Sequence, residues 1–319
     1  MTWKELNRFR AEFERADQPI AMATLVSAKG SSYRQPGARM LIAPDKHFVG
    51  HLSAGCLEDE IAEVAQGVIG TGKGVCMQFD LRARFGCDGS IEVFIERLSR
   101  PSAFIDGLAR AVNERAPILA ATSYDVVNGM TGTRILEGGI QSAPPYNANS
   151  AATKPREFLQ LIEPPVRLLL FGEHFDVQPI HELASFLGWE VEIWTDLHGI
   201  PNGDLRSACV VMSHNFGRDL AALKHLLANQ FGYIGLLGPR RRKQQLINYL
   251  IEEGYSPERL STLHSPAGLD IGAETAEEIA LAIAAEIQAA MTHRTAGYLR
   301  ERKAAIHTME DSSLCKVLP

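Results

Sequence analysis

The chain has 319 residues, of which 45% are hydrophobic and 22% are charged, and its formal net charge is −6. These values are typical of folded protein, and the length exceeds that of one average core, so we expect two domains. The acidic balance argues against general attraction to nucleic acid or to an anionic membrane surface. No apolar run approaches the roughly 20 residues that a membrane-spanning helix requires.

The amino-terminal segment 1–18 has the spacing of a charged amphipathic helix and lacks the apolar core of a signal peptide, so we expect a cytoplasmic protein. The five cysteines are odd in number and widely scattered, which argues against a disulfide framework. No CxxC or HExxH pair suggests a zinc site. The cysteines stand at positions 56, 76, 87, 209 and 315.

A strand is predicted over 20–26, and the stretch that follows, 30–60, is rich in glycine, proline and serine. Within it, a strand over 47–52 gives way to a helix whose apolar residues recur at helical spacing. Cys56 therefore lies in or just before a first helical turn, where free backbone N–H groups can hold an anion or stabilise a thiolate. The acids at 58–60 oppose a second negative charge, so its ionisation is left open.

Further strands are predicted over 74–80, 91–98, 118–123 and 133–136, with a helix over 101–114. Together they indicate a small α+β domain over residues 1–140. Cys87 lies on a glycine-flanked turn between two of these strands, whereas Cys76 alternates with Val75 and Met77 and is predicted to lie in the core. Periodicity is lost after 140, and we place an interdomain linker at 141–160.

From Val166 onward, strands and helices alternate. Strands are expected over 166–171, 190–195, 209–213 and 233–237, and helices over 177–187, 218–229 and from Pro239. This alternation predicts a Rossmann-like domain with a parallel sheet over 161–295, followed by a polar tail over 296–319. The fold class is α/β, and ligands are expected beyond the carboxyl ends of the strands.

The first turn of this second domain departs from a dinucleotide-binding loop. Gly172 keeps the first glycine of G-x-G-x-x-G, but His174 replaces the second, and Glu173 and Asp176 oppose a diphosphate. Asp196 stands where an acid that binds the ribose is expected, although acids after strands are also common turn residues. We therefore do not expect NAD(P) to bind in the usual way.

A better anion candidate follows the strand 233–237. Gly238 makes a turn, Pro239 is expected at the first helical position, and three arginines follow. A helix start supplies N–H groups and arginine supplies a planar fork of donors, which together suit a phosphate. Because consecutive helical residues point in different directions, at most two of the three arginines can face one phosphate. A solvated basic face is the alternative.

The last helix is predicted over 276–291, after a glycine-rich loop. Thr275 and Glu278 have the spacing of a capping box at its start. His214 and His264 are interpreted as structural histidines rather than catalysts.

These motifs resemble, in order, the signature of the XdhC/CoxI family. The resemblance covers about residues 20–287. Glycines typical of the family are missing at Ala54, Asp88 and His174, a hydroxyl is missing at Pro239, and an acid is missing at Asn215. The matching positions are Gly30, Ser31, Ser32, Arg34, Pro36, Gly37, Ala38, Gly50, Ser53, Gly55, Cys56, Glu58, Gly86, Cys87, Gly89, Gly172, Gly238, Arg240, Arg241 and the loop 264–275.

The resemblance implies an accessory protein that binds molybdenum cofactor, as molybdopterin or its cytosine dinucleotide. Such a protein supports the sulfuration of the cofactor with a cysteine desulfurase and delivers it to an apo molybdenum hydroxylase of the xanthine dehydrogenase type. We expect a homodimer. The candidate cofactor-binding residues are Arg34, Ser53, Gly55, Cys56, Cys87, Gly172, Asp196, Gly238, Arg240 and Arg241, with Cys56 as the contact to the metal.

We hypothesise that Cys56 contacts the metal end of the cofactor and that the turn 238–241 holds its phosphate, in one cleft between the domains. Two alternatives stay open: an NAD(P)-dependent oxidoreductase, suggested by the α/β pattern and Asp196, and a client-docking protein whose nucleotide loop has decayed. The client hydroxylase and the presence of a nucleotide on the cofactor are also open.

Overall fold

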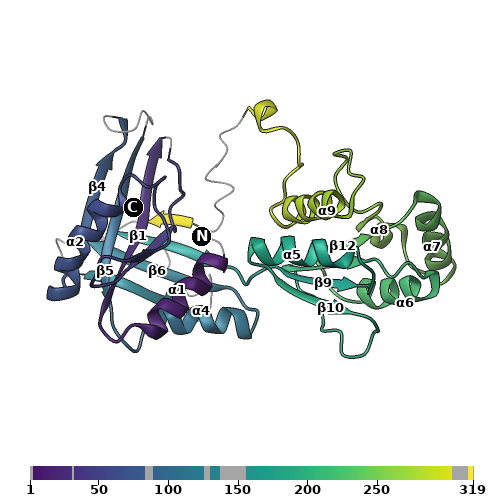
Figure 1. The fold of residues 1–319 in the computed structure, drawn as a ribbon, viewed down its shortest axis with the longest axis horizontal. Helices are drawn as coiled ribbons and strands as arrows, with labels where there is room; N and C mark the ends of the chain where they lie inside the picture. Colours follow the sequence, from purple (N-terminus) through teal and green to yellow (C-terminus); the bar gives the residue numbers. More distant parts are fainter. Residues whose placement is uncertain are drawn as a thin grey trace, which may run out of the picture. The chain divides into compact units, whose positions relative to one another are not determined.

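The computed structural model describes residues 3–30, 32–82, 89–125, 130–136, 156–303 and 315–318. The chain divides into two compact units, which are drawn in Figure 1: unit 1 comprises Met1–Pro164 and Ala304–Pro319, and unit 2 comprises Pro165–Lys303. Among the described residues, no helix combines the length and the apolar character that crossing a membrane would require.

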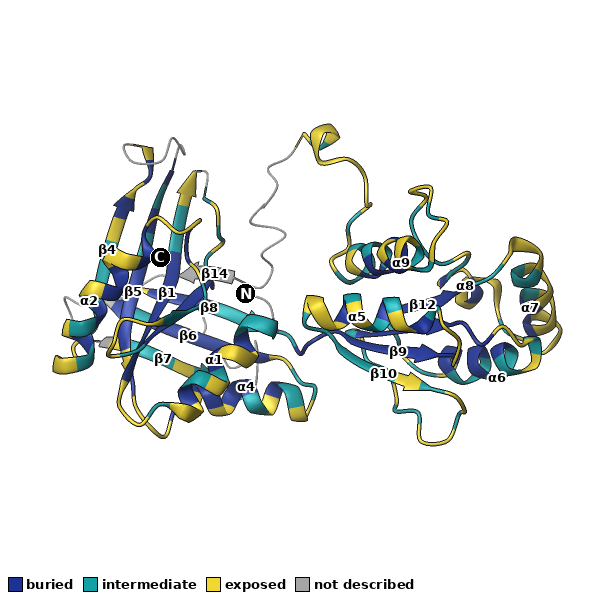
Figure 2. Ribbon diagram, viewed as in Figure 1, coloured by how far each residue is buried: buried dark blue, intermediate teal, exposed yellow. Residues whose placement is uncertain are grey.

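Unit 1 contains a five-stranded antiparallel sheet in the order β3-β2-β1-β5-β4. Its central strand β1 pairs with β2 on one side and β5 on the other. Buried residues, dark blue on the ribbon in Figure 2, follow these strands. The strands are β1 (Ile20–Gly30), β2 (Arg39–Ile42), β3 (Phe48–Val49), β4 (Val75–Asp80) and β5 (Gly89–Leu98).

Helices cover both faces of this sheet. One face packs against α2 (Glu58–Thr71) through a core that includes Leu25, Ile61 and Val93. The other face packs against α1 (Trp3–Arg15) and α4 (Ala103–Asn113). Because α1 and α4 place their apolar residues on one side, each buries a single stripe and leaves its polar side in solvent.

A second antiparallel sheet in unit 1 has the order β14-β8-β6-β7. It corrects two predicted boundaries. Residues 157–160 of the expected linker belong to a strand that pairs with β6, and the expected tail ends in a strand that pairs with β8; residues 141–155 lie outside the described part. The strands are β6 (Ile118–Asp125), β7 (Met130–Leu136), β8 (Glu157–Ile162) and β14 (Cys315–Leu318).

A buried arginine joins the two sheets of unit 1. Arg39 of β2 is 1% exposed, donates to the Gly37 carbonyl at 3.1 Å and to Gln160 of β8, and lies 4.5 Å from the ring centroid of Phe104. Burial raises the pKa of Glu96 against the opposing effects of a hydrogen bond from the β7 backbone and of the Arg39 charge. Because its carbonyl accepts from Arg39, Gly37 of the Pro-Gly-Ala motif has a structural role.

Unit 2 is a parallel five-stranded sheet in the order β10-β9-β11-β12-β13, which confirms the predicted Rossmann-like class. The order reverses between β9 and β11, whose connections run to opposite faces, and ligands of such sheets bind at this point. The strands are β9 (Arg167–Phe171), β10 (Glu190–Trp194), β11 (Ser207–Val211), β12 (Tyr233–Leu236) and β13 (Leu263–His264).

Five helices cover this sheet. Helices α5 (Val177–Leu187) and α9 (Ala276–Met291) pack on one face. Helices α6 (Phe216–Leu227), α7 (Arg240–Glu252) and α8 (Pro257–Leu260) pack on the other.

The bounds predicted for α5 and α9 agree with the structure, and Thr275 and Glu278 form the predicted capping box. The strand predicted over 47–52 is shorter, because only Phe48 and Val49 pair with β2 and the chain then turns at Gly50, with φ +91°. Glycine is required there, since an added Cβ would lie 2.4 Å from the Arg39 carbonyl oxygen.

Gly172 tests the packing at the point where the strand order reverses. A Cβ at this position would lie 2.8 Å from the Met212 carbonyl oxygen, so we predict that Gly172→Ala destabilises unit 2 by about 1–3 kcal/mol. The measurement is urea unfolding followed by the fluorescence of Trp189 and Trp194. The control is Gly217→Ala in α6, where a Cβ would come no closer than 3.6 Å to the Asn215 side chain and alanine should be neutral or stabilising by up to about 1 kcal/mol. Equal midpoints for both variants would contradict the packing account.

Candidate functional site

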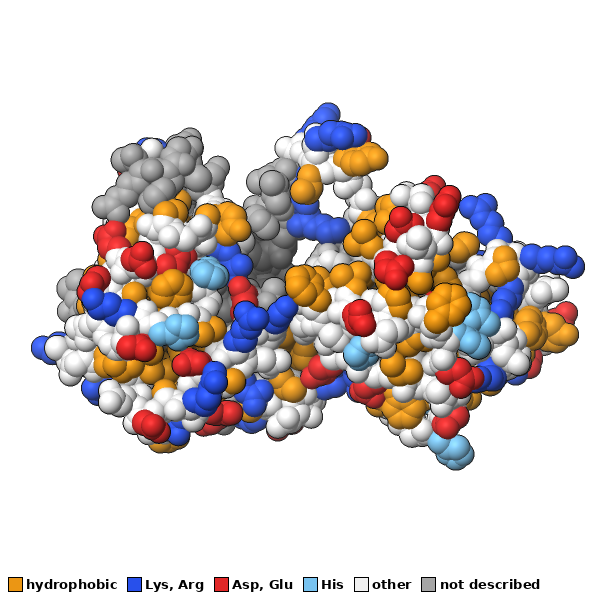
Figure 3. All heavy atoms as spheres, in the orientation of Figure 1, with side chains coloured by type: hydrophobic (Ala, Val, Ile, Leu, Met, Phe, Trp, Pro, Cys, Tyr) orange, Lys and Arg blue, Asp and Glu red, His pale blue; other side chains and the backbone are white. Residues whose placement is uncertain are grey.

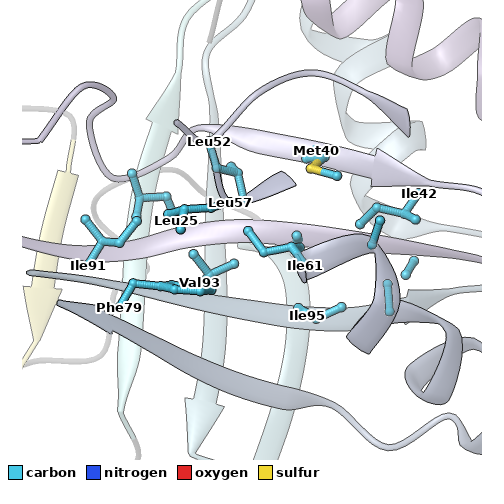
Figure 4. Packing of buried hydrophobic residues seen from close by; sticks show 14 of the residues in the cluster. Leu25, Met40, Ile42, Leu52, Leu57, Ile61, Phe79, Ile91, Val93 and Ile95 are labelled. Carbon is cyan, nitrogen blue, oxygen red and sulfur yellow. The ribbon is translucent and has the colours of Figure 1, made fainter. Parts of the chain in front are cut away.

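The first candidate site is the loop 53–56, which is anchored at both ends in the core of unit 1. Leu52 and Leu57 are 1% and 0% exposed, and Figure 4 shows both side chains among the apolar residues between the sheet and α2. Ala54, Gly55 and Cys56 between them are exposed. Burying two leucines provides about 1.5–3 kcal/mol each, which fixes the ends of the loop while its tip stays in solvent.

The interior of this loop is filled by the carboxylate of Glu58 and the hydroxyl of Ser53, both buried. One oxygen of Glu58 accepts from the N–H groups of Leu52 at 3.0 Å and Ser53 at 2.8 Å. The other accepts from the Ser53 hydroxyl at 2.5 Å and from Leu57 N–H at 3.1 Å. The loop is therefore folded around one carboxylate.

Burial by itself would raise the pKa of Glu58. The hydrogen bonds from the Ser53 side chain and from the backbone of Ser53 and Leu57 act in the opposite direction and outweigh it, so the pKa of Glu58 is lowered. Glu58 is thus ionised at neutral pH, and its charge is stabilised by hydrogen bonds within the loop. Sequence reasoning counted this acid among the groups facing the thiol.

Cys56 presents an exposed thiol at the tip of the loop, two residues before α2 begins. Gly55 precedes it with φ +107°, a conformation that favours glycine. The expectation of free N–H groups around the sulfur is wrong: those of Gly55, Cys56 and Leu57 point to the Ser53 hydroxyl oxygen at 3.2, 3.1 and 3.3 Å. The loop fixes the thiol but does not offer these donors to an anion.

The other predicted groups of unit 1 lie elsewhere. Arg34 is paired with Glu5 of α1 at 3.0 Å, and both side chains are about three-quarters buried. Cys87 lies outside the described residues. Cys76 is half-buried in β4, and burial raises the pKa of its thiol. The thiol of Cys209 in β11 is buried in the core of unit 2, which raises its pKa further.

The second candidate site is the carboxyl edge of the sheet in unit 2. The loop after β9 carries Glu173, His174, Phe175 and Asp176, and the loop after β11 carries His214. Asp176 and His214 Nε2 are 2.8 Å apart, and the rings of His174 and His214 have centroids 5.1 Å apart. The two loops therefore meet at the point where the strand order reverses.

Arg218 of α6 links the loop after β9 to the end of β10 at this edge. It pairs with Glu173 at 2.6 Å and donates to the Thr195 carbonyl. Asp196, the predicted ribose-binding acid, accepts from the backbone N–H of His198 at 2.8 Å in a local turn and is exposed. The carboxylate thus stabilises a turn, which is the alternative role that the sequence analysis gave it.

The turn at Gly238 leads into α7, with φ +148° at the glycine. The helix begins at Arg240, so Pro239 is the N-cap residue rather than the first helical residue. Arg240 and Arg241 are exposed, and neither forms an ion pair with any described residue. Both predicted arginines are therefore available to a ligand.

The third arginine turns inward and was missed as a structural anchor. Arg242 pairs at 2.5 Å with Asp219, which is 0% exposed and also accepts from the Ser213 hydroxyl. The next residue, Lys243, donates to the Ser265 carbonyl at 2.6 Å. These contacts tie the first turn of α7 to α6 and to the loop after β13. Only the angular position on the helix separates Arg242 from its neighbours.

Glu286 of α9 anchors the glycine-rich loop 264–275. It accepts from the hydroxyl of Tyr233 at 2.7 Å and from the N–H of Gly268 at 2.7 Å, and it pairs with His264 at 3.1 Å. Burial opposes these contacts, but together they lower the pKa of Glu286. His264 also stacks on Tyr233, with centroids 4.4 Å apart, so its structural interpretation agrees with these contacts.

Within the described part of the chain, no three His, Cys, Asp or Glu side chains are grouped so that they could hold a metal ion. The candidate sites therefore offer single contacts: one exposed thiol, two exposed arginines and a set of aromatic rings.

Residues 14–80 match the XdhC and CoxI family, and residues 168–287 match the XdhC Rossmann domain. The first match contains the Cys56 loop. The second contains both the point where the strand order reverses and the Gly238 turn. The chain belongs to the XdhC/CoxI family.

Three curated relatives are similar to the chain. A protein of Bacillus subtilis named as a probable xanthine dehydrogenase subunit is 27% identical over 85% of this chain and 92% of its own length. The molybdenum cofactor insertion chaperone PaoD of Escherichia coli is 24% identical over 90% of this chain and 88% of its own length. The uncharacterized protein YqeB of Escherichia coli is 28% identical over 87% of this chain but only 44% of its own length.

A solved structure supports the fold. A crystal structure described as a xanthine dehydrogenase from Bacillus halodurans has a TM-score of 0.74 and 24% identity to this chain, covering 95% of it and 98% of that chain.

We predict that Glu58→Gln destabilises unit 1 by about 1.5–3 kcal/mol, because an amide cannot replace a carboxylate that accepts these hydrogen bonds. The folded pKa of Glu58 lies below its ordinary value of 4.5. Its contribution is therefore present above that value and is lost as pH falls through the folded pKa. Urea midpoints of the parent and the variant should differ at pH 7, and the difference should shrink as pH falls from about 4.5 through the folded pKa.

The matched control is Asp59→Asn, which removes one charge from the exposed neighbouring residue and should shift the midpoint by less than about 0.5 kcal/mol. A difference between the parent and Glu58→Gln that persists unchanged at low pH would show that the carboxylate charge does not hold the loop.

Proposed function

We propose that the chain is an accessory protein that binds molybdenum cofactor as cargo, supports its sulfuration with a cysteine desulfurase and delivers it to an apo molybdenum hydroxylase. Membership of the family and similarity to a protein named as a molybdenum cofactor insertion chaperone support this proposal. The observation that carries it is the exposed thiol of Cys56 on a loop whose own hydrogen bonds are all internal.

A rigid, exposed thiol suits the metal end of the cargo, because thiolate sulfur is a soft ligand. The preceding Gly55 and Ser53 act by fixing the backbone. The hydroxyl oxygen of Ser53 also lies 3.7 Å from the sulfur of Cys56. The protein's part in this step is to hold and orient one sulfur. We assign it no turnover chemistry.

The turn at Gly238 suits the phosphate of the cargo. Arg240 and Arg241 are exposed at the start of a 13-residue helix, so their charge and the helix N-terminus favour an anion at the same place. Arg242 and Asp219 neutralise each other behind them. We propose that this turn binds the phosphate of the cargo.

We predict that Cys56→Ala abolishes retention of molybdenum cofactor on protein purified without oxygen, with an unchanged unfolding midpoint because the side chain is exposed. Molybdenum and pterin content per chain are the measurements. The matched control is Cys76→Ala, which removes a half-buried thiol of the same unit and should retain the parent's cofactor content. Undiminished content and delivery to apo-hydroxylase by Cys56→Ala would refute the role of the sulfur.

The paired change Arg240→Gln with Arg241→Gln should weaken cofactor binding about tenfold or more, because charged hydrogen bonds contribute about 1.5–3 kcal/mol each. The control, Arg259→Gln with Lys303→Gln, makes the same change in net charge at two exposed positions of unit 2 and should bind like the parent. Equal losses in both pairs would attribute the effect to overall charge.

A further inference from the structure

Three aromatic residues lie in the two loops that meet where the strand order of unit 2 reverses. His174 and Phe175 lie in the loop after β9, and His214 lies in the loop after β11. Phe175 is 84% exposed, and the His214 side chain is 44% exposed. In Figure 3, histidine and hydrophobic side chains border one another on the surface of this unit. We call His174, Phe175 and His214 the ring cluster.

The two imidazoles of the ring cluster contact each other, and one of them contacts a carboxylate. His214 has φ +54°, a left-handed conformation that few non-glycine residues adopt and that is common at functional sites. Asp176 lies 2.8 Å from His214 Nε2, and the imidazole of His174 stands at 62° to that of His214. In the tautomer of His214 that donates from Nε2 to the Asp176 carboxylate, Nδ1 is an acceptor.

The groups around the ring cluster do not favour an anion. Glu173 pairs with Arg218, and the carboxylate of Asp176 lies 2.8 Å from His214 Nε2. Among the described residues, no excess positive charge therefore surrounds the ring cluster itself, which disfavours a diphosphate there but suits a neutral, flat ring that stacks on aromatic side chains. Donor groups on the edge of such a ring would find His214 Nδ1.

We infer that the ring cluster binds the pterin ring of the cargo, a deepening that rests on the proposed function. The strand order supplies the distance. The ends of β9 and β12 are two strand spacings apart, or about 10 Å. A fused pterin system whose phosphate lies at its far end can therefore reach from the ring cluster to the turn at Gly238 within one unit.

The test titrates the full chain with 6-hydroxymethylpterin, a pterin without metal, dithiolene or phosphate, and follows quenching of the pterin fluorescence. Phe175→Ala should weaken binding about tenfold, because stacking on an aromatic side chain contributes about that factor or more. Phe175→Tyr keeps a stacking ring and should restore binding. The matched control is Phe186→Ala, which makes the same change at a ring that is 68% exposed. This ring lies near the C-terminal end of α5.

Weaker binding in Phe175→Ala, rescue by tyrosine and no change in Phe186→Ala support the inference. Equal affinity in the parent and Phe175→Ala overturns it. So does a parent chain that retains intact molybdenum cofactor but not the simple pterin, a result that leaves the proposed function standing. Failure to bind either compound overturns both. Binding of NADPH that is lost in Phe175→Ala and Asp196→Asn would assign the edge to a dinucleotide instead.

Discussion

The carboxylate of Glu58 organises the arrangement around Cys56. It fills the inside of a loop whose backbone donors would otherwise be buried without partners, and together with the Ser53 hydroxyl it satisfies them. The cost of burying an acid is offset by these hydrogen bonds, so the charge remains. The result is one thiol fixed in solvent at the tip of an otherwise closed loop.

Unit 2 also compensates its buried charge at the edge of its sheet. Asp219 and Arg242 neutralise each other below the surface, and Ser213 links them to the loop after β11. The loop that carries His214 and the turn that carries Arg240 are thus joined by one buried network. A phosphate at the turn and a ring at the loop would contact neighbouring parts of the same sheet edge. This arrangement is consistent with a single extended ligand.

Local signals in the sequence were sufficient for most of the helices and for the parallel class of the sheet in unit 2. The bounds of α5 and α9 follow from apolar spacing and caps that lie within the segments. Strand β8 was missed because its pairing with β6 joins residues far apart in the chain, on either side of a stretch without periodicity. Glu58 and Arg242 were misjudged for a related reason: only the folded chain shows which of several adjacent like charges turns inward.

Whether this chain carries molybdenum cofactor can be decided by native mass spectrometry and metal analysis of the unmodified protein, produced alongside cofactor biosynthesis and purified without oxygen. We expect one pterin and one molybdenum per chain, released by unfolding and transferable to an apo molybdenum hydroxylase. A protein that emerges free of both, yet still captures the hydroxylase, would contradict the proposed role as a carrier and indicate a docking protein instead.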